Sequence, residues 1–279
     1  MRLLLLTALT MIAFAANSVL NRIGVGLLEM EASAFAFWRT LAGAVALWLL
    51  VRRRGNRPSR PLARRLGGAA ALALYMVGFS LAYRSLDAGL GALILFGALQ
   101  LVLFGWALAQ GEEVGARRWG GMALAFAGLV WLLWPSGAAV VPRTGAFSML
   151  AAAVGWGIYT ILGRAEADPL GATASNFAWA MPFVALPALP VLTGLPSPAA
   201  LATALLAGAV TSGLGYALWY RVLPQLATST AGIAQLSVPV IAILGGGALL
   251  GEAVTPRMWI AALAVLGGIA LAVTPRRRT

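Results

Sequence analysis

Long apolar stretches separated by short polar breaks run through the whole chain. Each stretch holds about 20 residues, which is the length that crosses a bilayer as an α-helix. The stretches predict ten transmembrane helices at residues 3–24, 32–51, 66–86, 88–110, 115–135, 144–164, 170–193, 199–221, 227–250 and 256–274. We therefore expect an all-α integral membrane protein. The breaks are too short to hold a separate soluble domain.

One short pattern occurs twice in the chain. The residues G-E-x-V-x-x-R-x-W occupy positions 111–119 and again positions 251–259. In each copy an apolar stretch follows and ends at a proline, which is Pro135 in the first copy and Pro275 in the second. The two copies indicate that the chain contains an internal duplication.

The duplication predicts how the two halves cross the membrane. Residues 1–135 and residues 136–279 each contain five of the ten stretches. Because five is an odd number, the second half must enter the membrane from the opposite side, so the sequence predicts two inverted five-helix repeats. In transporters built this way, the substrate site lies near the bilayer midplane where the repeats meet.

The first stretch also fits a second interpretation. Its basic start, apolar core and Ala-Phe-Ala triplet are typical of a cleaved secretory signal. However, it aligns with the stretch at 144–164, so that Phe14 falls on Trp156 and Asn17 falls on Tyr159. We therefore expect this segment to be retained as the first helix.

Composition and charge support the membrane interpretation and add an orientation. Hydrophobic residues make up 61% of the chain, charged residues 10%, and the mean hydropathy is +0.89. All twenty basic residues behind the net charge of +12 are arginines, and their densest clusters lie at residues 52–65 and 276–278. The positive-inside rule places both clusters in the cytoplasm, and with them both termini of a multi-pass protein of the bacterial inner (plasma) membrane. A basic cytoplasmic loop explains this charge, so we expect no nucleic-acid partner.

The residue inventory excludes several kinds of chemistry. The chain has no Cys, no His and no Lys, which removes thiolate nucleophiles, imidazole bases, Ser-Lys pairs and most transition-metal sites. Its eight acidic residues all fall near the ends of the predicted helices. We expect no catalytic residue, no metal and no cofactor, and strong proton coupling is not favoured.

Several motifs resemble the drug/metabolite transporter superfamily, EamA type. They are the L-G-E-like turns at 110–112 and 250–252 and the S-V-P sequence at 237–239. The family's W-G-x-N pattern corresponds to F-A-A-N at 14–17 and W-G-I-Y at 156–159. The resemblance covers the whole chain and is greatest to bacterial aromatic amino acid exporters. It implies a secondary transporter that exports amino acids, aromatic or hydrophobic ones above all.

Polar and aromatic side chains at helical spacing mark a candidate substrate site. They recur every three or four residues on the first and third helices, and the duplication maps them onto the sixth and eighth. Amide groups on the fourth and ninth helices add hydrogen-bonding capacity. The predicted substrate-binding residues are Phe14, Asn17, Tyr75, Phe79, Gln100, Trp156, Tyr159, Ser212, Tyr216 and Gln235. Such a chamber suits an amphipathic, amino acid-like solute.

Helix-bending residues mark candidate gates. Pro182 lies inside the seventh stretch and Pro239 at the start of the ninth, and Gly246 is the middle residue of a Gly-Gly-Gly run. The first half has Leu99 where the second has Pro239, so a kink there must have another cause.

Alternatives remain open at this stage. The amides could be hydrogen-bonding glue between helices, and the aromatic stripes could be packing. Arg39, inside the second stretch, could reach the outer interface or hold a substrate carboxylate. Glu112 and Glu252 could pair with Arg117 and Arg257.

The fold also serves exporters of other amphipathic metabolites or drugs, while an intramembrane enzyme or a lipid scramblase is a different class that the inventory disfavours. The expected surroundings are the lipid bilayer, and the protein is either a monomer or a weak homodimer.

Overall fold

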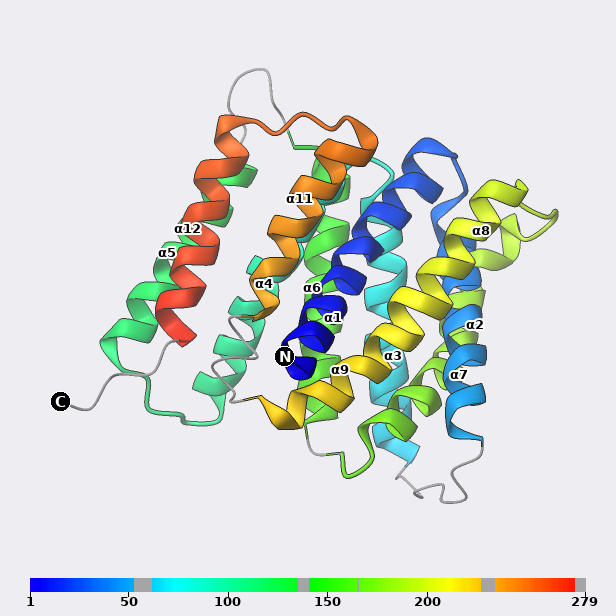
Figure 1. Ribbon diagram of the computed structural model, residues 1–279, viewed down its shortest axis with the longest axis horizontal. Coiled ribbons are helices and arrows are strands. Elements are labelled where there is room, and N and C mark those ends of the chain that lie inside the picture. Colours follow the sequence, from blue (N-terminus) through cyan, green and yellow to red (C-terminus); the bar gives the residue numbers. More distant parts are fainter. Residues whose placement is uncertain (53–61, 135–140, 165, 227–233, 274–279) are drawn as a thin grey trace.

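The computed structural model describes residues 1–52, 62–134, 141–164, 166–226 and 234–273, and among these residues there is no β-strand (Figure 1). The first half forms α1 (Arg2–Asn21), α2 (Ala32–Val51), α3 (Leu62–Ala82), α4 (Ala88–Ala109) and α5 (Ala116–Leu133). The second half forms α6 (Arg143–Gly163), α7 (Pro169–Ala188), α8 (Pro198–Leu206), α9 (Gly215–Val222), α11 (Ser237–Leu250) and α12 (Pro256–Val273). Short 3-10 turns, η2 (Leu189–Val191) and η4 (Leu223–Gln225), extend α7 and α9.

Two π-helical segments widen the backbone within the spans. The segment η1 (Arg22–Leu27) continues α1, and η3 (Ala207–Leu214) joins α8 to α9. Such segments are rare and occur frequently at functional sites, because the wider turn leaves backbone groups to be satisfied by other partners. One of them contacts the candidate site described below.

The described helices have the length and surface of a membrane protein. Eight continuous helical segments are long and apolar enough to cross a bilayer, and α11 is a shorter apolar helix. Large apolar side chains such as Phe126, Leu186 and Leu263 are exposed on the outside of the bundle. An apolar exterior of this extent marks a surface that faces lipid. The expected all-helical, multi-pass membrane protein is therefore confirmed.

The observed helix ends follow the predicted stretches closely, with two differences. The third helix begins at Leu62 and ends at Ala82, earlier at both ends than the predicted stretch 66–86, because the residues after Ala82 form the turn into α4. The predicted stretch 227–250 corresponds to α11, and its first residues, 227–233, lie outside the described part of the chain.

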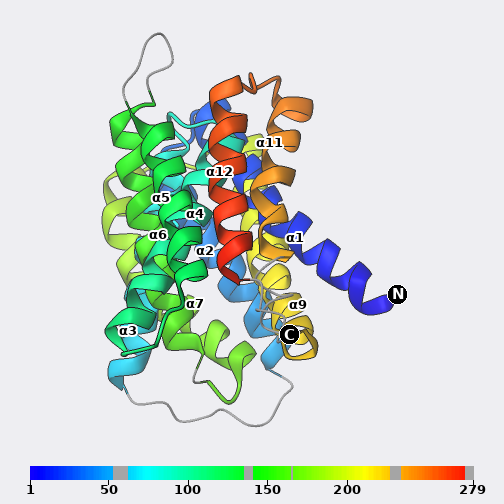
Figure 2. The same ribbon diagram turned by 90° about the vertical axis from the view of Figure 1, so that its left-hand side faces the viewer.

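Helices from the two halves alternate through the bundle. α5 packs against α12 at one edge, and the two run in opposite directions (Figures 1 and 2). In the rest of the bundle α3 packs against α6, α2 against α7 and η3, and α1 against α11 and α9. The turns between α3 and α4 and between α11 and α12 lie at the upper side of Figure 1, and those after α4 and α6 lie at the lower side. The contact between the halves therefore extends through the whole core.

Two glycines allow the edge helices to touch backbone to backbone. A Cβ at Gly121 would lie 2.4 Å from the carbonyl oxygen of Gly268, and a Cβ at Gly268 would lie 2.5 Å from the carbonyl oxygen of Gly121. No side chain fits at either position without separating the helices. Small residues at a membrane helix interface permit this close approach, which increases van der Waals packing where lipid supplies no hydrophobic driving force.

Candidate functional site

Five aromatic rings from four segments meet at the centre of the bundle. Trp156 of α6 lies 4.9 Å from Tyr75 of α3 and 5.1 Å from Tyr216 of α9, measured between ring centroids. Phe14 of α1 contacts Tyr216 edge-on at 5.7 Å, and Phe79 contacts Tyr75 at 5.2 Å. Each half contributes, so the cluster lies at their junction.

A small cavity lies among these rings. Its volume is about 20 Å³, enough for roughly one water molecule and too small for an amino acid. Its lining residues are Phe14, Asn17, Ser18, Tyr75, Phe79, Leu95, Phe96, Trp156, Tyr216 and Gln235. Seven of the ten predicted site residues therefore share one cavity, which must widen before it can admit a solute.

The other three predicted residues lie elsewhere. The ring of Tyr159 stacks on Trp156 with centroids 5.4 Å apart, and its hydroxyl lies 3.1 Å from Oγ1 of Thr173. Ser212 lies in η3, behind the cavity wall. Gln100 is in α4, about one helical turn beyond Phe96, and does not line the cavity.

Asn17 joins α1 to the π-helical segment η3. Its Nδ2 donates to the backbone carbonyl of Thr211 at 3.2 Å, and its Oδ1 accepts from the hydroxyls of Thr211 at 2.6 Å and Ser212 at 3.2 Å. The amide thus satisfies a carbonyl in a segment where the regular helical bonding is interrupted. Asn17 therefore connects α1 to η3 and also lines the cavity.

Arg39 of α2 is the residue that the sequence-based site list lacks. Its side chain is fully buried, with 0% exposure. Its Nε donates to Oγ of Ser212 and its Nη2 donates to the hydroxyl of Tyr75, both at 3.2 Å. Its Cζ also lies 4.9 Å from the ring centroid of Phe79. The arginine therefore points into the bundle and does not reach the interface. A charge within a predicted membrane helix was the available signal.

Charged residues link the two halves at the upper side of the bundle. Arg22, at the start of η1, contacts Glu252 through Nε at 3.3 Å and Asp87 through Nη2 at 3.4 Å. Glu252 also accepts hydrogen bonds from the backbone N–H of Ala88, at 3.0 Å to Oε1 and 2.8 Å to Oε2. We call these four residues the upper seal. They connect the turn before α12 to α1 and α4 of the first half.

The repeat mate of Glu252 behaves differently. Glu112, at the lower side, pairs with Arg118 in its own half at 2.9 Å, and its side chain is 57% exposed, against 10% for Glu252. Glu252 binds Arg22, and Arg257 donates to the backbone carbonyls of Trp131 and Trp134. Loss of hydration is the main cause that raises the pKa of the Glu252 carboxyl; Asp87 adds to the rise, and the Ala88 N–H and Arg22 oppose it.

The predicted gate residues occupy three different settings. Gly246 lies against the upper seal, where an added Cβ would stand 2.2 Å from Oε2 of Glu252. Pro239 is buried in the first turn of α11, and Pro182 lies inside α7 without ending it. Only Gly246 therefore contacts the seal directly among these three.

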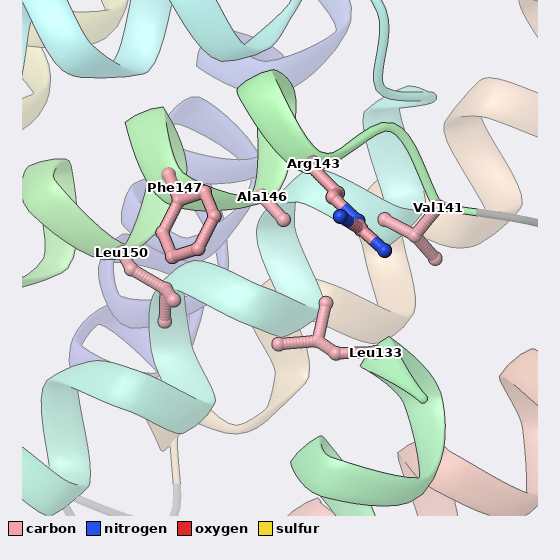
Figure 3. A pocket seen from close by; sticks show the side chains of 6 residues that line it. All are labelled: Leu133, Val141, Arg143, Ala146, Phe147 and Leu150. Carbon is pink, nitrogen blue, oxygen red and sulfur yellow. The ribbon is translucent and has the colours of Figure 1, made fainter. Parts of the chain in front are cut away.

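A larger pocket lies away from the aromatic cluster. It has a volume of about 290 Å³ and is lined by Leu133, Val141, Arg143, Ala146, Phe147 and Leu150, at the upper ends of α5 and α6 (Figure 3). The polar cluster of Asn17, Ser212 and Arg39 is not part of it. We therefore take the smaller central cavity as the candidate site.

Comparison with known proteins agrees with this architecture. The family model of the EamA-like transporter family matches residues 143–274. The chain is 48% identical to an uncharacterized protein of Pseudomonas aeruginosa over 99% of its own length and 96% of that protein. A protein crystal structure superposes with a TM-score of 0.67 over 96% of this chain and 95% of the other, at 18% identity. The last match supports the fold alone.

Proposed function

We propose that the chain is a secondary transporter that exports small amphipathic metabolites, above all amino acids with aromatic or other apolar side chains. The match of residues 143–274 to the family model of the EamA-like transporter family supports this proposal. The solute binds in the central cavity, and the two halves open it alternately to either side of the membrane. The observation that carries this proposal is the cavity itself, because its aromatic and amide lining comes from both halves.

Two inverted repeats provide the mechanism that we propose. Exchanging each helix of one half for its counterpart in the other reproduces the most extensive packing pairs. In this exchange α1 takes the place of α6, η3 and α9 take the place of α3, and α11 takes the place of α4. The contact of α3 with α6 then corresponds to the contact of η3 and α9 with α1, and the contact of α4 with α6 corresponds to that of α11 with α1. The counterparts α5 and α12 also run in opposite directions (Figure 2). Such symmetry allows a second conformation in which the halves exchange their arrangements, so the cavity opens to the opposite side.

The charged contacts indicate which side is closed in this structure. The upper seal joins the halves through Glu252, whereas Glu112 at the lower side is exposed and pairs within its own half. By the positive-inside rule, the arginine-rich lower side faces the cytoplasm. We place both termini on this same side and the protein in the bacterial inner membrane. We therefore infer that the structure is closed toward the outside. Opening to the outside requires Glu252 to release Ala88 and Arg22.

Counterflow in liposomes tests the proposal. Purified protein is reconstituted into vesicles loaded with unlabelled phenylalanine, leucine or aspartate, and uptake of the same labelled amino acid is measured. We expect accelerated exchange of phenylalanine and leucine but not of aspartate. Absence of exchange for all three would remove the amino acid proposal and favour other metabolites or drugs. Movement of a fluorescent phospholipid between leaflets in the same vesicles would instead indicate a scramblase.

A further inference from the structure

Arg39 carries a charge that no acidic side chain balances. It is the eighth residue of α2, about 10 Å from the start of the helix. All eight acidic residues of the chain lie within the described part, at helix ends or turns, and none of them pairs with Arg39. Its Nη1 is buried and has no hydrogen-bond partner among the described residues. An arginine in a membrane helix usually faces a cavity or a partner group.

The groups around Arg39 compensate the charge only in part. Ser212 and Tyr75 accept one hydrogen bond each, and the rings of Tyr75 and Phe79 lie 5.4 Å and 4.9 Å from Cζ. Guanidinium has five N–H groups and does not lose its proton in proteins, so the unsatisfied donors on Nη1 cannot be removed by titration. Two hydroxyls and two rings do not supply the negative charge that a buried cation requires.

Every group that contacts Arg39 also contacts the cavity or its wall. The rings of Tyr75 and Phe79 line the cavity, and Ser212 donates to Asn17, which lines it too. Arg39 therefore lies one side chain behind the lining, on the side where α2 packs against η3.

We propose that Arg39 binds the carboxylate of the transported solute. This deepens the proposed function of the same cavity and rests on it. Guanidinium and carboxylate match as a planar, two-bond pair, and Nη1 supplies donors that are already unoccupied. The apolar body of the solute lies against Trp156, Tyr216 and Phe14, whose rings line the same cavity. The Tyr75 hydroxyl is the group that the carboxylate displaces at Nη2.

The same geometry makes the carboxylate essential and an amino group dispensable. No acidic residue lines the cavity among its described neighbours. An ammonium group would meet only uncharged partners in this lining, namely aromatic faces, hydroxyls such as that of Ser18, and the amides of Asn17 and Gln235. A solute without a carboxylate leaves Arg39 unbalanced, whereas a solute without an ammonium loses only these weaker contacts.

Three phenylalanine-like probes test this directly. Phenylalanine carries both groups, 3-phenylpropanoate lacks the ammonium, and 2-phenylethylamine lacks the carboxylate. The first readout is the rise in Tm of the purified protein with each probe, and the second is competition with phenylalanine counterflow in liposomes. We expect 3-phenylpropanoate to act at concentrations within several-fold of phenylalanine, and 2-phenylethylamine to require at least about tenfold more.

Variants at two positions separate binding from structure. Arg39→Met should abolish the preference for the acid over the amine, and Arg39→Lys should keep the preference with weaker binding. Tyr75→Phe removes one contact of Nη2 and keeps the ring, so it should retain the preference. It therefore provides a folded variant if Arg39→Met is unstable.

Distinct results overturn the two proposals. Equal Tm shifts with the amine and the acid, or an unchanged preference in Arg39→Met, would overturn the role of Arg39 even if amino acids exchange. A Tm shift with 3-phenylpropanoate that depends on Arg39, without counterflow of any amino acid, would support the carboxylate site and overturn the proposed amino acid export.

Discussion

The carboxylate of Glu252 accepts hydrogen bonds from the backbone N–H of Ala88, and the Ala88 nitrogen lies 3.0 Å from Oε1 and 2.8 Å from Oε2. Ala88 is the first residue of α4, whose N-cap residue Asp87 makes no capping bond of its own. An acid at a helix N-terminus satisfies a free N–H and interacts favourably with the helix dipole. A residue of one half thus caps a helix of the other, and the opening proposed for the upper side would break this contact.

Removing the cap should open the upper seal. Glu252→Ala removes the contacts to Ala88 and Arg22, so we expect the cavity to become accessible from outside. The chain has no Cys, so Ser18→Cys introduces a single reporter in the cavity lining. Labelling of this residue by a membrane-impermeant thiol reagent should increase about tenfold, as expected if the closed state loses roughly 1.4 kcal/mol. The matched variant Glu112→Ala, at the exposed repeat mate, should leave labelling unchanged.

The seal should also respond to pH. The pKa of Glu252 is raised above its usual 4.5 in the closed structure, chiefly by loss of hydration. The closed state therefore binds the proton more tightly than an open state in which Glu252 meets water, and it gains stability below pH 4.5. This gain is lost as the pH rises through the raised pKa, so Ser18→Cys labelling should increase with pH. Labelling of an exposed Gly194→Cys variant corrects for the reactivity of the thiol.

A second substitution checks that Glu252 is the titrating group. Glu252→Gln keeps an oxygen that accepts from Ala88 and cannot ionise. In the Glu252→Gln protein, we divide the labelling rate of Ser18→Cys by the labelling rate of Gly194→Cys. This ratio should stay constant from about pH 4 to about pH 7. The same pH dependence in this variant as in the parent would mean that another group controls the seal.

The periodicity of the sequence predicts those parts of the structure that depend on one helix at a time. The length of the apolar stretches matches the bilayer, so the spans follow from it. Residues on one helical face, such as Phe14 with Asn17 and Tyr75 with Phe79, reach the same cavity. Gln100 was included for its amide alone, and a polar group in α4 does not have to face the centre.

Contacts between distant segments could not be predicted in this way. Arg39 can reach either an interface or a cavity, and only the packing of α2 against η3 decides between them. The pairing of Glu252 with Arg22 joins residues 230 positions apart, whereas local spacing favoured Arg257. The π-helical turn that makes Asn17 a structural connector also has no simple sequence signature.

Asn17 should contribute to stability as well as to binding. Asn17→Leu keeps the volume but removes three hydrogen bonds to η3. Interhelical hydrogen bonds in membranes contribute about 0.6 kcal/mol each on average, so we expect a loss of about 1 to 2 kcal/mol. Unfolding with SDS in mixed micelles measures this. The control is Thr10→Val on the same helix, because the Thr10 hydroxyl donates only to Leu6 of α1. An Asn17→Leu variant as stable as this control would contradict the connection to η3.

Trp156 should be required for transport more than for folding. It contacts Tyr75, Tyr159 and Tyr216 at the centre of the cluster, so Trp156→Leu removes the main aromatic wall of the cavity. We expect the rate of phenylalanine counterflow to fall at least about tenfold, since stacking on an aromatic ring and its buried area both contribute to binding. Trp106→Leu, at an exposed position in α4, is the matched control and should exchange at the parental rate. Equal rates for the two variants would place the solute elsewhere.

Neighbouring glycines in α12 should respond in opposite ways to alanine. A Cβ at Gly268 would lie 2.5 Å from the carbonyl oxygen of Gly121 and 2.7 Å from the backbone nitrogen of Ala125, whereas nothing lies within 4 Å of a Cβ at Gly267. Gly268→Ala must therefore separate α12 from α5, and we expect a loss of about 1 to 3 kcal/mol, the usual cost of overpacking. Gly267→Ala lacks this collision and gains helix propensity, so it should be neutral or stabilising by up to about 1 kcal/mol. SDS unfolding of both variants gives the comparison. If Gly268→Ala were as stable as Gly267→Ala, the backbone contact between α5 and α12 would be incorrect, because no flexible side chain is available there to move aside.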